Sequence, residues 1–348
     1  SVYTPFMQGA YETFDRVKEA EAQKPQSLPK TAAVATESNS SLDNFTPGIV
    51  TGTVVIKEKI GGGNFGEVFK GTWDGTKVAL KRVMGSPTDL YREMAVLSKL
   101  AHPNVVSCYG LYKSPQGETY IVTEFMNRGS LDKLLAQQKD KITLVDLLAM
   151  AKQAASGMVY LEREKVVHRD LALRNLLVAN TGEEDEKYIV KVADFGLSRM
   201  SKGGTYKSDS KIIPFKWSAL EIILNETYEY TSKADVWSFG VVLWEMFSYG
   251  LTPYLGMSNI EAVEFIREGG RMKQPQTCPD EMYVLMLRCW ESDPEKRPSF
   301  KQIVTEINAL FLQQSQTELE SHVQEVAAEH SSPTNYLRRS IIHREKDE

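Results

Sequence analysis

The pattern of apolar and polar residues divides the chain into a region of strand-like segments followed by a region of helix-like segments. Between Val54 and Glu124, short runs rich in β-branched and aromatic residues alternate with turn signals such as Asp74-Gly75. This alternation is typical of antiparallel strands joined by hairpins. Strands are expected at 54–56, 77–83, 105–112 and 119–124. One helix is expected among them, at 88–100, where apolar residues recur at the spacing of one helix face.

Helical periodicity dominates after residue 127. Candidate helices lie at 131–137 and 144–162, and further helices are expected to begin at Ser218, Lys233, Asn259, Glu281 and Ser299. The longest apolar stretch, 236–247, contains Glu245 and is shorter than the roughly 20 apolar residues that a membrane span needs. It is therefore expected to be a buried core helix.

The two ends of the chain differ from its centre. Residues 1–48 contain Pro25 and Pro29 among many Ser, Thr and Asn residues, and they are expected to form a flexible leader with one short helix at 11–22. Residues 315–348 are expected to form a C-terminal tail. Within it, Thr317 and Glu320 have the spacing of a capping box, which predicts a helix that begins there and ends before Pro333.

Composition restricts the class of protein without deciding its function. The 348 residues are 42% hydrophobic and 25% charged, as is ordinary for a soluble globular protein, and the net charge of −5 gives no reason to expect nucleic acid as a partner. The three cysteines are widely spaced, which argues against a disulfide framework or a structural zinc site. Because the chain lacks an initiator Met, it is expected to be a fragment of a longer protein.

A polar loop between apolar runs carries the first candidate chemistry. Asp170 and Asn175 lie in this loop, and Asp194 opens Asp-Phe-Gly after the next apolar run. Phosphoryl transfer from ATP needs one carboxylate to orient the attacking hydroxyl and accept its proton, together with oxygen ligands for magnesium. The spacing therefore predicts Asp170 as the proton acceptor, and Asn175 and Asp194 as the magnesium ligands.

A glycine-rich segment supplies the second candidate site, in which the backbone could close over the phosphates of ATP. The motif Gly-x-Gly-x-x-Gly at 61–66 also occurs in dinucleotide-binding folds, but there it joins a strand to a helix, whereas here it lies between two predicted strands. Lys81 follows on the next strand, where alternation places it on the same face as Ala79. The predicted helix carries Glu93, which is expected to form an ion pair with Lys81.

In these motifs and their order, the sequence resembles the catalytic domains of protein kinases. The resemblance implies an α+β, bilobal protein kinase fold at 49–314. It has a small antiparallel β-sheet N-lobe with one main helix (49–126) and a larger, mostly helical C-lobe (127–314). The implied ATP-binding residues are Ile60, Gly61, Gly63, Gly66, Val68, Ala79, Lys81, Thr123, Glu124, Met126 and Leu177. Structural roles are implied for Glu221, which pairs with Arg297, and for Asp235, which holds the catalytic loop from beneath.

Two features favour the protein tyrosine kinases within this family. Ala172 stands where serine/threonine kinases usually have Lys, and Arg174 supplies a cation later in the same loop. The segment 213–217 resembles the peptide platform of tyrosine kinases. A serine/threonine or dual-specificity kinase and a pseudokinase scaffold are the alternatives. The four residues Lys81, Asp170, Asn175 and Asp194, which pseudokinases commonly lose in part, are all present.

Regulation and location are also implied by the resemblance. Tyr206 is expected to be an autophosphorylation site whose phosphate binds Arg169 and Arg199. The expected partners are protein substrates with tyrosine acceptors, and phosphotyrosine-binding adaptors that dock at Tyr336. The leader and tail resemble those of receptor tyrosine kinases. We therefore expect a receptor fragment on the cytoplasmic side of the plasma membrane, tethered through a segment missing from this chain, with a cytoplasmic kinase as the alternative.

Overall fold

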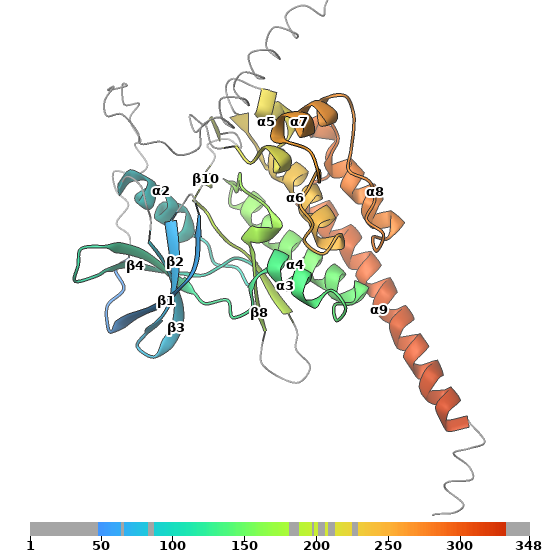
Figure 1. Cartoon of the computed structure of the whole chain (residues 1–348), viewed down its shortest axis with the longest axis horizontal. Coiled ribbons are helices and arrows are strands. Elements are labelled where there is room, and N and C mark those ends of the chain that lie inside the picture. Colours follow the sequence, from blue (N-terminus) through green and yellow to red (C-terminus); the bar gives the residue numbers. More distant parts are fainter. Residues whose placement is uncertain are drawn as a thin grey trace, which may run out of the picture.

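The structure is a computed structural model that shows two lobes (Figure 1). It describes residues 48–63, 66–82, 87–180, 188–196, 198–200, 206–207, 213–224 and 229–331. The predicted leader helix at 11–22 and the end of the tail with Tyr336 lie outside the described residues.

The first lobe is built on a five-stranded antiparallel sheet with the order β1-β2-β3-β5-β4. Its strands are β1 (Val54–Gly63), β2 (Gly66–Trp73), β3 (Thr76–Arg82), β4 (Cys108–Lys113) and β5 (Thr119–Glu124), and its helix is α2 (Pro87–Leu97). Asp74 and Gly75 both have positive φ, which suits the two-residue turn between β2 and β3. On β3, Val78 and Leu80 are buried, so Ala79 and Lys81 share the opposite face as predicted.

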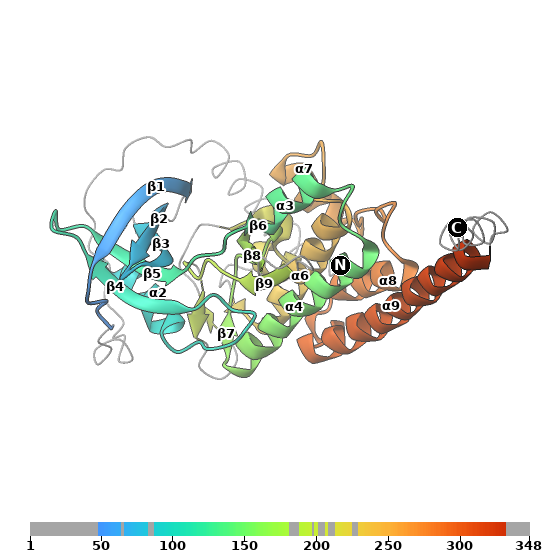
Figure 2. The same cartoon turned by 90° about the horizontal axis from the view of Figure 1, so that it is seen from below.

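The second lobe is mostly helical, and short strands lie where it meets the first lobe (Figures 1 and 2). Its helices are α3 (Leu131–Gln138), α4 (Leu144–Arg163), α5 (Leu220–Leu224), α6 (Ser232–Phe247), α7 (Asn259–Arg267), α8 (Asp280–Cys289) and α9 (Phe300–Ser331). β6 (Gly129–Ser130), β8 (Leu176–Asn180) and β9 (Tyr188–Val192) form one sheet. Two-residue strands pair β7 (Val166–Val167) with β10 (Arg199–Met200), and β11 (Tyr206–Lys207) with β12 (Glu229–Tyr230). These features confirm the predicted bilobal fold.

Helix α6 is the centre of the second lobe. Almost all its residues are buried, and Thr231 caps its first turn by accepting a hydrogen bond from the Lys233 amide. The sequence predicted this helix correctly as a core element. In the described part of the chain, no helix combines the length and the apolar character of a membrane span.

The separate tail helix predicted from Thr317 is wrong. Instead, α9 runs without a break from Phe300 to Ser331, packs along α4 and extends beyond the lobe (Figure 2). Thr317 is an interior residue of this helix, and its hydroxyl donates to the carbonyl oxygen of Gln313 at 3.0 Å. Residues 300–331 contain neither Gly nor Pro, so nothing in the sequence ends the helix earlier.

The strand predicted at 105–112 starts later, at Cys108. Val105 forms an isolated bridge with Val192 of the second lobe, and the Val106 amide donates to the Val192 carbonyl oxygen at 2.9 Å. These two residues therefore join the lobes instead of extending β4.

Arg297 forms a buried ion pair that joins distant parts of the second lobe. Its guanidinium donates to both carboxylate oxygens of Glu221, at 2.6 and 2.8 Å, and its Nε donates to the Glu291 carbonyl oxygen at 2.8 Å. The guanidinium also lies 5.0 Å from the ring centroid of Trp237. The predicted pairing of Glu221 with Arg297 is confirmed.

We predict that Glu221→Ala lowers the free energy of unfolding by about 3 kcal/mol, because it leaves the buried Arg297 cation without its carboxylate. Glu306→Ala is the matched control. Its partner Arg288 is 42% exposed, so that pair should contribute less than about 1 kcal/mol. Urea denaturation of the two variants measures both values. Equal losses would contradict the structural role of the Glu221 pair.

Candidate active site

A carboxylate of α6 holds the polar loop after β7 in place. Asp235 Oδ2 accepts a hydrogen bond from the His168 amide at 2.7 Å, and its Oδ1 accepts one from the Arg169 amide at 2.9 Å. Arg169 has φ of 71°, a conformation that a non-glycine residue adopts only when its surroundings hold it there. Burial raises the pKa of Asp235, while the two amides and the nearby His168 and Arg169 oppose that rise. Asp235 thus has the position that the sequence predicted.

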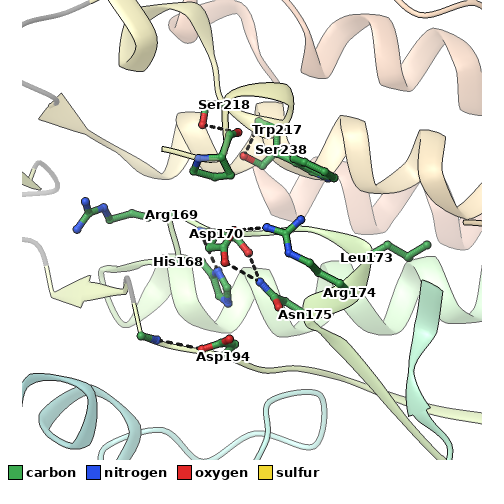
Figure 3. A network of polar contacts seen from close by, with 12 residues as sticks. His168, Arg169, Asp170, Leu173, Arg174, Asn175, Asp194, Trp217, Ser218 and Ser238 are labelled. Carbon is green, nitrogen blue, oxygen red and sulfur yellow. Dashed lines mark hydrogen bonds and ion pairs between the residues drawn. The ribbon is translucent and has the colours of Figure 1, made fainter. Parts of the chain in front are cut away.

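Two side chains of the loop, those of Arg174 and Asn175, contact Asp170 (Figure 3). The guanidinium of Arg174 contacts Asp170 Oδ1 at 2.5 Å, and the Asn175 amide nitrogen donates to Asp170 Oδ2 at 3.0 Å. Asn175 also donates to the Asp170 carbonyl oxygen at 2.6 Å. Asp170 and Asn175 are buried, whereas the Arg174 side chain is 40% exposed. The loop therefore fixes the carboxylate while a cation remains open to an incoming group.

Asp194 lies on the segment that faces the catalytic loop (Figure 3). Lys81 links it to the first lobe. The Lys81 ammonium lies 2.8 Å from Asp194 Oδ1 and 2.8 Å from Glu93 Oε1 of α2, which confirms the predicted ion pair with Glu93. Burial alone would lower the pKa of Lys81, but the two carboxylates raise it above its ordinary value. Burial likewise opposes ionisation of Asp194, yet Lys81 holds the pKa of that carboxyl below its ordinary value. Lys81 is therefore a fixed cation.

The donor atoms of Asn175 and Asp194 fit a magnesium ion. The amide nitrogen of Asn175 is used by Asp170, which leaves the amide oxygen as the available ligand, and Asp194 offers its second oxygen. No cluster of three or more His, Cys, Asp or Glu side chains suitable for a metal exists among the described residues. One carboxylate with an amide oxygen suits Mg²⁺, which usually completes its shell with water and substrate phosphates.

The residues predicted to bind ATP lie together on the first lobe and beside the connection to the second lobe. In register, Val68 lies opposite Gly61 and Lys81, and Ala79 lies opposite Thr123. Gly63 and Gly66 pair at the hairpin end, and Gly66 has φ of 130°, which favours glycine. Ile60 is 44% exposed on β1, and Leu177 packs with Met126 in a small apolar cluster.

The backbone amides of Glu124 and Met126, at the connection between the lobes, differ in their hydrogen bonds. The Glu124 amide already donates to the Ser107 carbonyl oxygen at 3.0 Å, whereas the Met126 amide donates to no described residue. The Glu124 side chain also accepts from Lys191 Nζ at 2.7 Å, which ties the connection to β9. The Met126 amide is thus available to the adenine ring that the resemblance predicts there. The sequence did not reveal the role of Lys191.

Comparison with known proteins decides the family. A family model described as protein tyrosine and serine/threonine kinase matches residues 54–307. The chain belongs to this family. The chain is similar to tyrosine-protein kinase Fer of Homo sapiens, with 40% sequence identity over 264 residues. It is also similar to the Homo sapiens tyrosine-protein kinases ABL2 and Srms, with 39% identity over 296 residues and 43% over 261 residues.

These matches cover most of the kinase domain but only part of each relative. They include 74%, 83% and 73% of this chain, and 31%, 24% and 52% of Fer, ABL2 and Srms, respectively. The names of all three specify tyrosine-protein kinases, in agreement with the predicted resemblance. None of the three names mentions a receptor, so the receptor origin expected from the leader and tail has no support here.

The peptide platform of the kinase domain is anchored from several directions. It includes the 3-10 helix η2 (Phe215–Trp217), and Ser238 of α6 donates to the Trp217 carbonyl oxygen at 2.7 Å. Lys216 Nζ donates to the Met257 carbonyl oxygen at 2.6 Å. The Trp217 ring also lies 4.5 Å from the Arg174 guanidinium carbon. This contact joins the platform to the loop that carries Asp170.

The residues predicted to be regulatory lie near one another. Tyr206 of β11 pairs in register with Tyr230 of β12, and the Arg169 guanidinium carbon lies 4.3 Å from the Tyr230 ring centroid. Arg199 of β10 pairs with Val167 of β7, beside the same loop. The side chains of Tyr206 and Arg199 lie outside the described residues.

We predict that Lys81→Met lowers the phosphorylation rate by about 10²–10³-fold, because it removes a fixed cation from the phosphate site. Steady-state kinetics measures the rate, and thermal unfolding checks that the fold persists. Lys70→Met, on the adjacent strand, is the control, since the Lys70 ammonium pairs with the exposed Glu58 and lies 5.5 Å from the ring centroid of Phe125. A Lys81 variant with normal stability and normal activity would refute the assigned role.

Proposed function

We propose that this domain is an ATP- and magnesium-dependent protein tyrosine kinase, which transfers the γ-phosphoryl group of ATP to tyrosine hydroxyls of proteins. The observation that carries the proposal is the arrangement of Arg174, which contacts Asp170 on one side and the platform residue Trp217 on the other. A cation in this position lies between the proton acceptor and the surface that would hold the peptide. The similarity to tyrosine-protein kinases supports the same activity.

Each group on the chain has a defined task in this proposal. Asp170 orients the acceptor hydroxyl and accepts its proton, and Arg174 stabilises charge at the transferring phosphoryl group. Lys81 positions the phosphates of ATP, with its own position fixed by Glu93. Asn175 would hold magnesium together with Asp194. When bound there, the ion neutralises phosphate charge.

Neither alternative function is favoured by a specific observation. A pseudokinase scaffold needs none of the contacts among Lys81, Glu93 and Asp194, yet these contacts are formed. A serine/threonine kinase would be expected to have Lys at the position of Ala172, within the same loop. The geometry therefore supports tyrosine kinase activity best.

The proposals on location and adaptors rest on the sequence alone. Docking of phosphotyrosine-binding adaptors at Tyr336 stays a prediction, since that residue lies outside the described part of the chain. Attachment to the cytoplasmic side of the plasma membrane, through a segment absent from this chain, also stays a prediction. The names of the relatives give no support to the receptor form of that proposal.

The test of the function compares peptides that are identical except for Tyr, Ser or Thr at the acceptor position. We expect the tyrosine peptide alone to be phosphorylated efficiently with ATP and magnesium. Comparable rates on the serine or threonine peptide would overturn the assignment.

Asp170→Asn should retain ATP binding and lose about 10²–10⁴-fold in turnover, because it removes the positioned proton acceptor. Asp140→Asn, which changes an exposed carboxylate, serves as the control.

Tyr206 provides a separate prediction about regulation. Phosphorylation adds about −1.5 to −2 charge and three acceptor oxygens, and Arg169, near the strand partner of Tyr206, is a suitable cation. Tyr206→Phe should keep basal activity but lose the rise in activity that follows preincubation with ATP. Activity is assayed before and after preincubation, with Tyr109→Phe, an exposed tyrosine on β4, as the control. Full activation of the Tyr206 variant would show that another site is responsible.

A further inference from the structure

The last helix extends well beyond the lobe on which it packs. Its contact with α4 includes Asn308, whose Oδ1 accepts a hydrogen bond from Lys152 Nζ at 3.2 Å, and Phe311, whose ring centroid lies 4.5 Å from the same ammonium. Every residue from 316 to 324 is exposed, and the helix continues away from the lobe to Ser331 (Figures 1 and 2). We call residues 316–331 the projecting half of α9.

A stripe of exposed apolar side chains leads along this helix. Leu312, Leu319 and Val323 are 58%, 64% and 59% exposed, respectively. Their spacing of seven and four residues places them on one face of the helix. A single exposed apolar side chain needs no explanation, but a row along one face is typical of a surface on which another helix packs.

The projecting half is also acidic, with its charges poorly placed for a helix that stands alone. It contains four glutamates and no Lys or Arg, since the sequence has no basic residue of either kind at 302–337. The glutamates therefore lack the basic partners, three or four residues away, that usually stabilise exposed helices. Glu329 lies in the last turn, where the negative end of the helix dipole disfavours a carboxylate. A basic partner would relieve both effects.

The sequence that follows α9 has the complementary chemistry. Residues 332–348 lie outside the described residues. Within them, 337–346 contain four basic residues and one acidic residue, together with Leu337, Ile341 and Ile342 at helical spacing. The connection Ser-Pro-Thr-Asn at 332–335 has the length and the composition of a turn between two antiparallel helices.

We propose that residues 336–348 fold back along the projecting half of α9 as an antiparallel helical partner. A return through 332–335 brings residue 336 beside residue 331, and each later residue one position further back. Arg338 then lies beside Glu329, at the negative end of the helix dipole. Arg344 lies beside Val323, within one turn of Glu320. The basic residues of the tail therefore meet the acidic residues of α9 in this register.

The same register places Ile341 within one turn of Val323, so apolar residues also meet. As a helix with a rise of 1.5 Å per residue, 336–348 spans about 20 Å and reaches back to about residue 319. Leu312, on the same stripe, stays uncovered. The proposal concerns packing of the chain on itself and does not depend on kinase activity.

Limited trypsin digestion of the full chain tests the fold-back, because Arg338 and Arg339 are themselves cleavage sites. Docking protects them, and the cleavage rate follows the fraction of open tail. Val323→Asp should raise the rate at which the C-terminal peptide is released about tenfold, which corresponds to about 1.4 kcal/mol of lost docking free energy. Leu312→Asp is the matched control, since it places the same charge on the same stripe beyond the reach of the tail. Its cleavage rate should equal that of the wild type.

A second substitution tests whether the two apolar residues meet. Ile341→Asp should accelerate cleavage as Val323→Asp does, and the double variant should be cleaved no faster, because the same contact can be lost only once. Raising the salt concentration from about 0.05 M to about 0.5 M should accelerate cleavage of the wild type, because it screens the charges that attract the tail. Val323→Asp, already open, measures the effect of salt on trypsin itself.

Three outcomes would overturn the proposal. The first is an equal cleavage rate for the wild type, Val323→Asp and Leu312→Asp. The second is additive acceleration in the double variant, which would show that Val323 and Ile341 do not meet. The third is protection that increases with protein concentration, accompanied by dimers in sedimentation equilibrium, which would place a second copy of the chain on the stripe instead of the tail.

Discussion

The active site depends on the two hydrogen bonds from backbone amides to Asp235. Asp235 is the fixed point against which the loop from His168 to Asn175 is built, and the left-handed backbone of Arg169 follows from that anchoring. A buried carboxylate that lacked such donors would be strongly unfavourable, so the loop and α6 stabilise each other. Asp170, the proposed proton acceptor, thus lies in a loop that is held in place by Asp235, which has no part in the proposed reaction.

Helix α6 carries a second buried carboxylate, and the two divide the support of the site. Asp235, in the first turn, binds the start of the catalytic loop, whereas Glu245, near the other end of the helix, binds the middle of that loop and the platform. Because the two carboxylates lie at different ends of one rigid helix, that helix supports both the catalytic loop and the platform. Rigid secondary structure suits such support better than a loop does, because the geometry of catalytic groups must be kept within a fraction of an ångström.

Much of this arrangement could be predicted because the motifs that carry the chemistry stand in a recognisable order. The pair of Lys81 with Glu93 was expected because the cation needs a partner that fixes its position, whereas the pair of Glu221 with Arg297 was implied by the resemblance to protein kinases. The signal for Glu245 was also present in the sequence, since a charged residue within an apolar run of helix must find a polar partner. Its partners, however, come from segments far away in the sequence, and periodicity cannot identify them.

Other errors have equally local causes. Strands of two residues, such as β10 and β11, are too short for any alternation to appear, so the sequence could not predict them. The spacing of Thr317 and Glu320 matched a capping box, but such a spacing also occurs by chance inside a continuous helix. Val105 and Val106 have the composition of a strand, and their pairing with β9 depends on the way the two lobes meet.

The contact between Lys81 and Asp194 has a thermodynamic consequence. In this structure the ammonium is shared between Glu93 and Asp194, so a phosphate group that attracts Lys81 competes with Asp194 for it. When the ammonium turns towards phosphate, Asp194 regains an oxygen that can bind a cation. Nucleotide and metal should therefore bind with positive cooperativity, and by reciprocity each must raise the affinity for the other by the same factor.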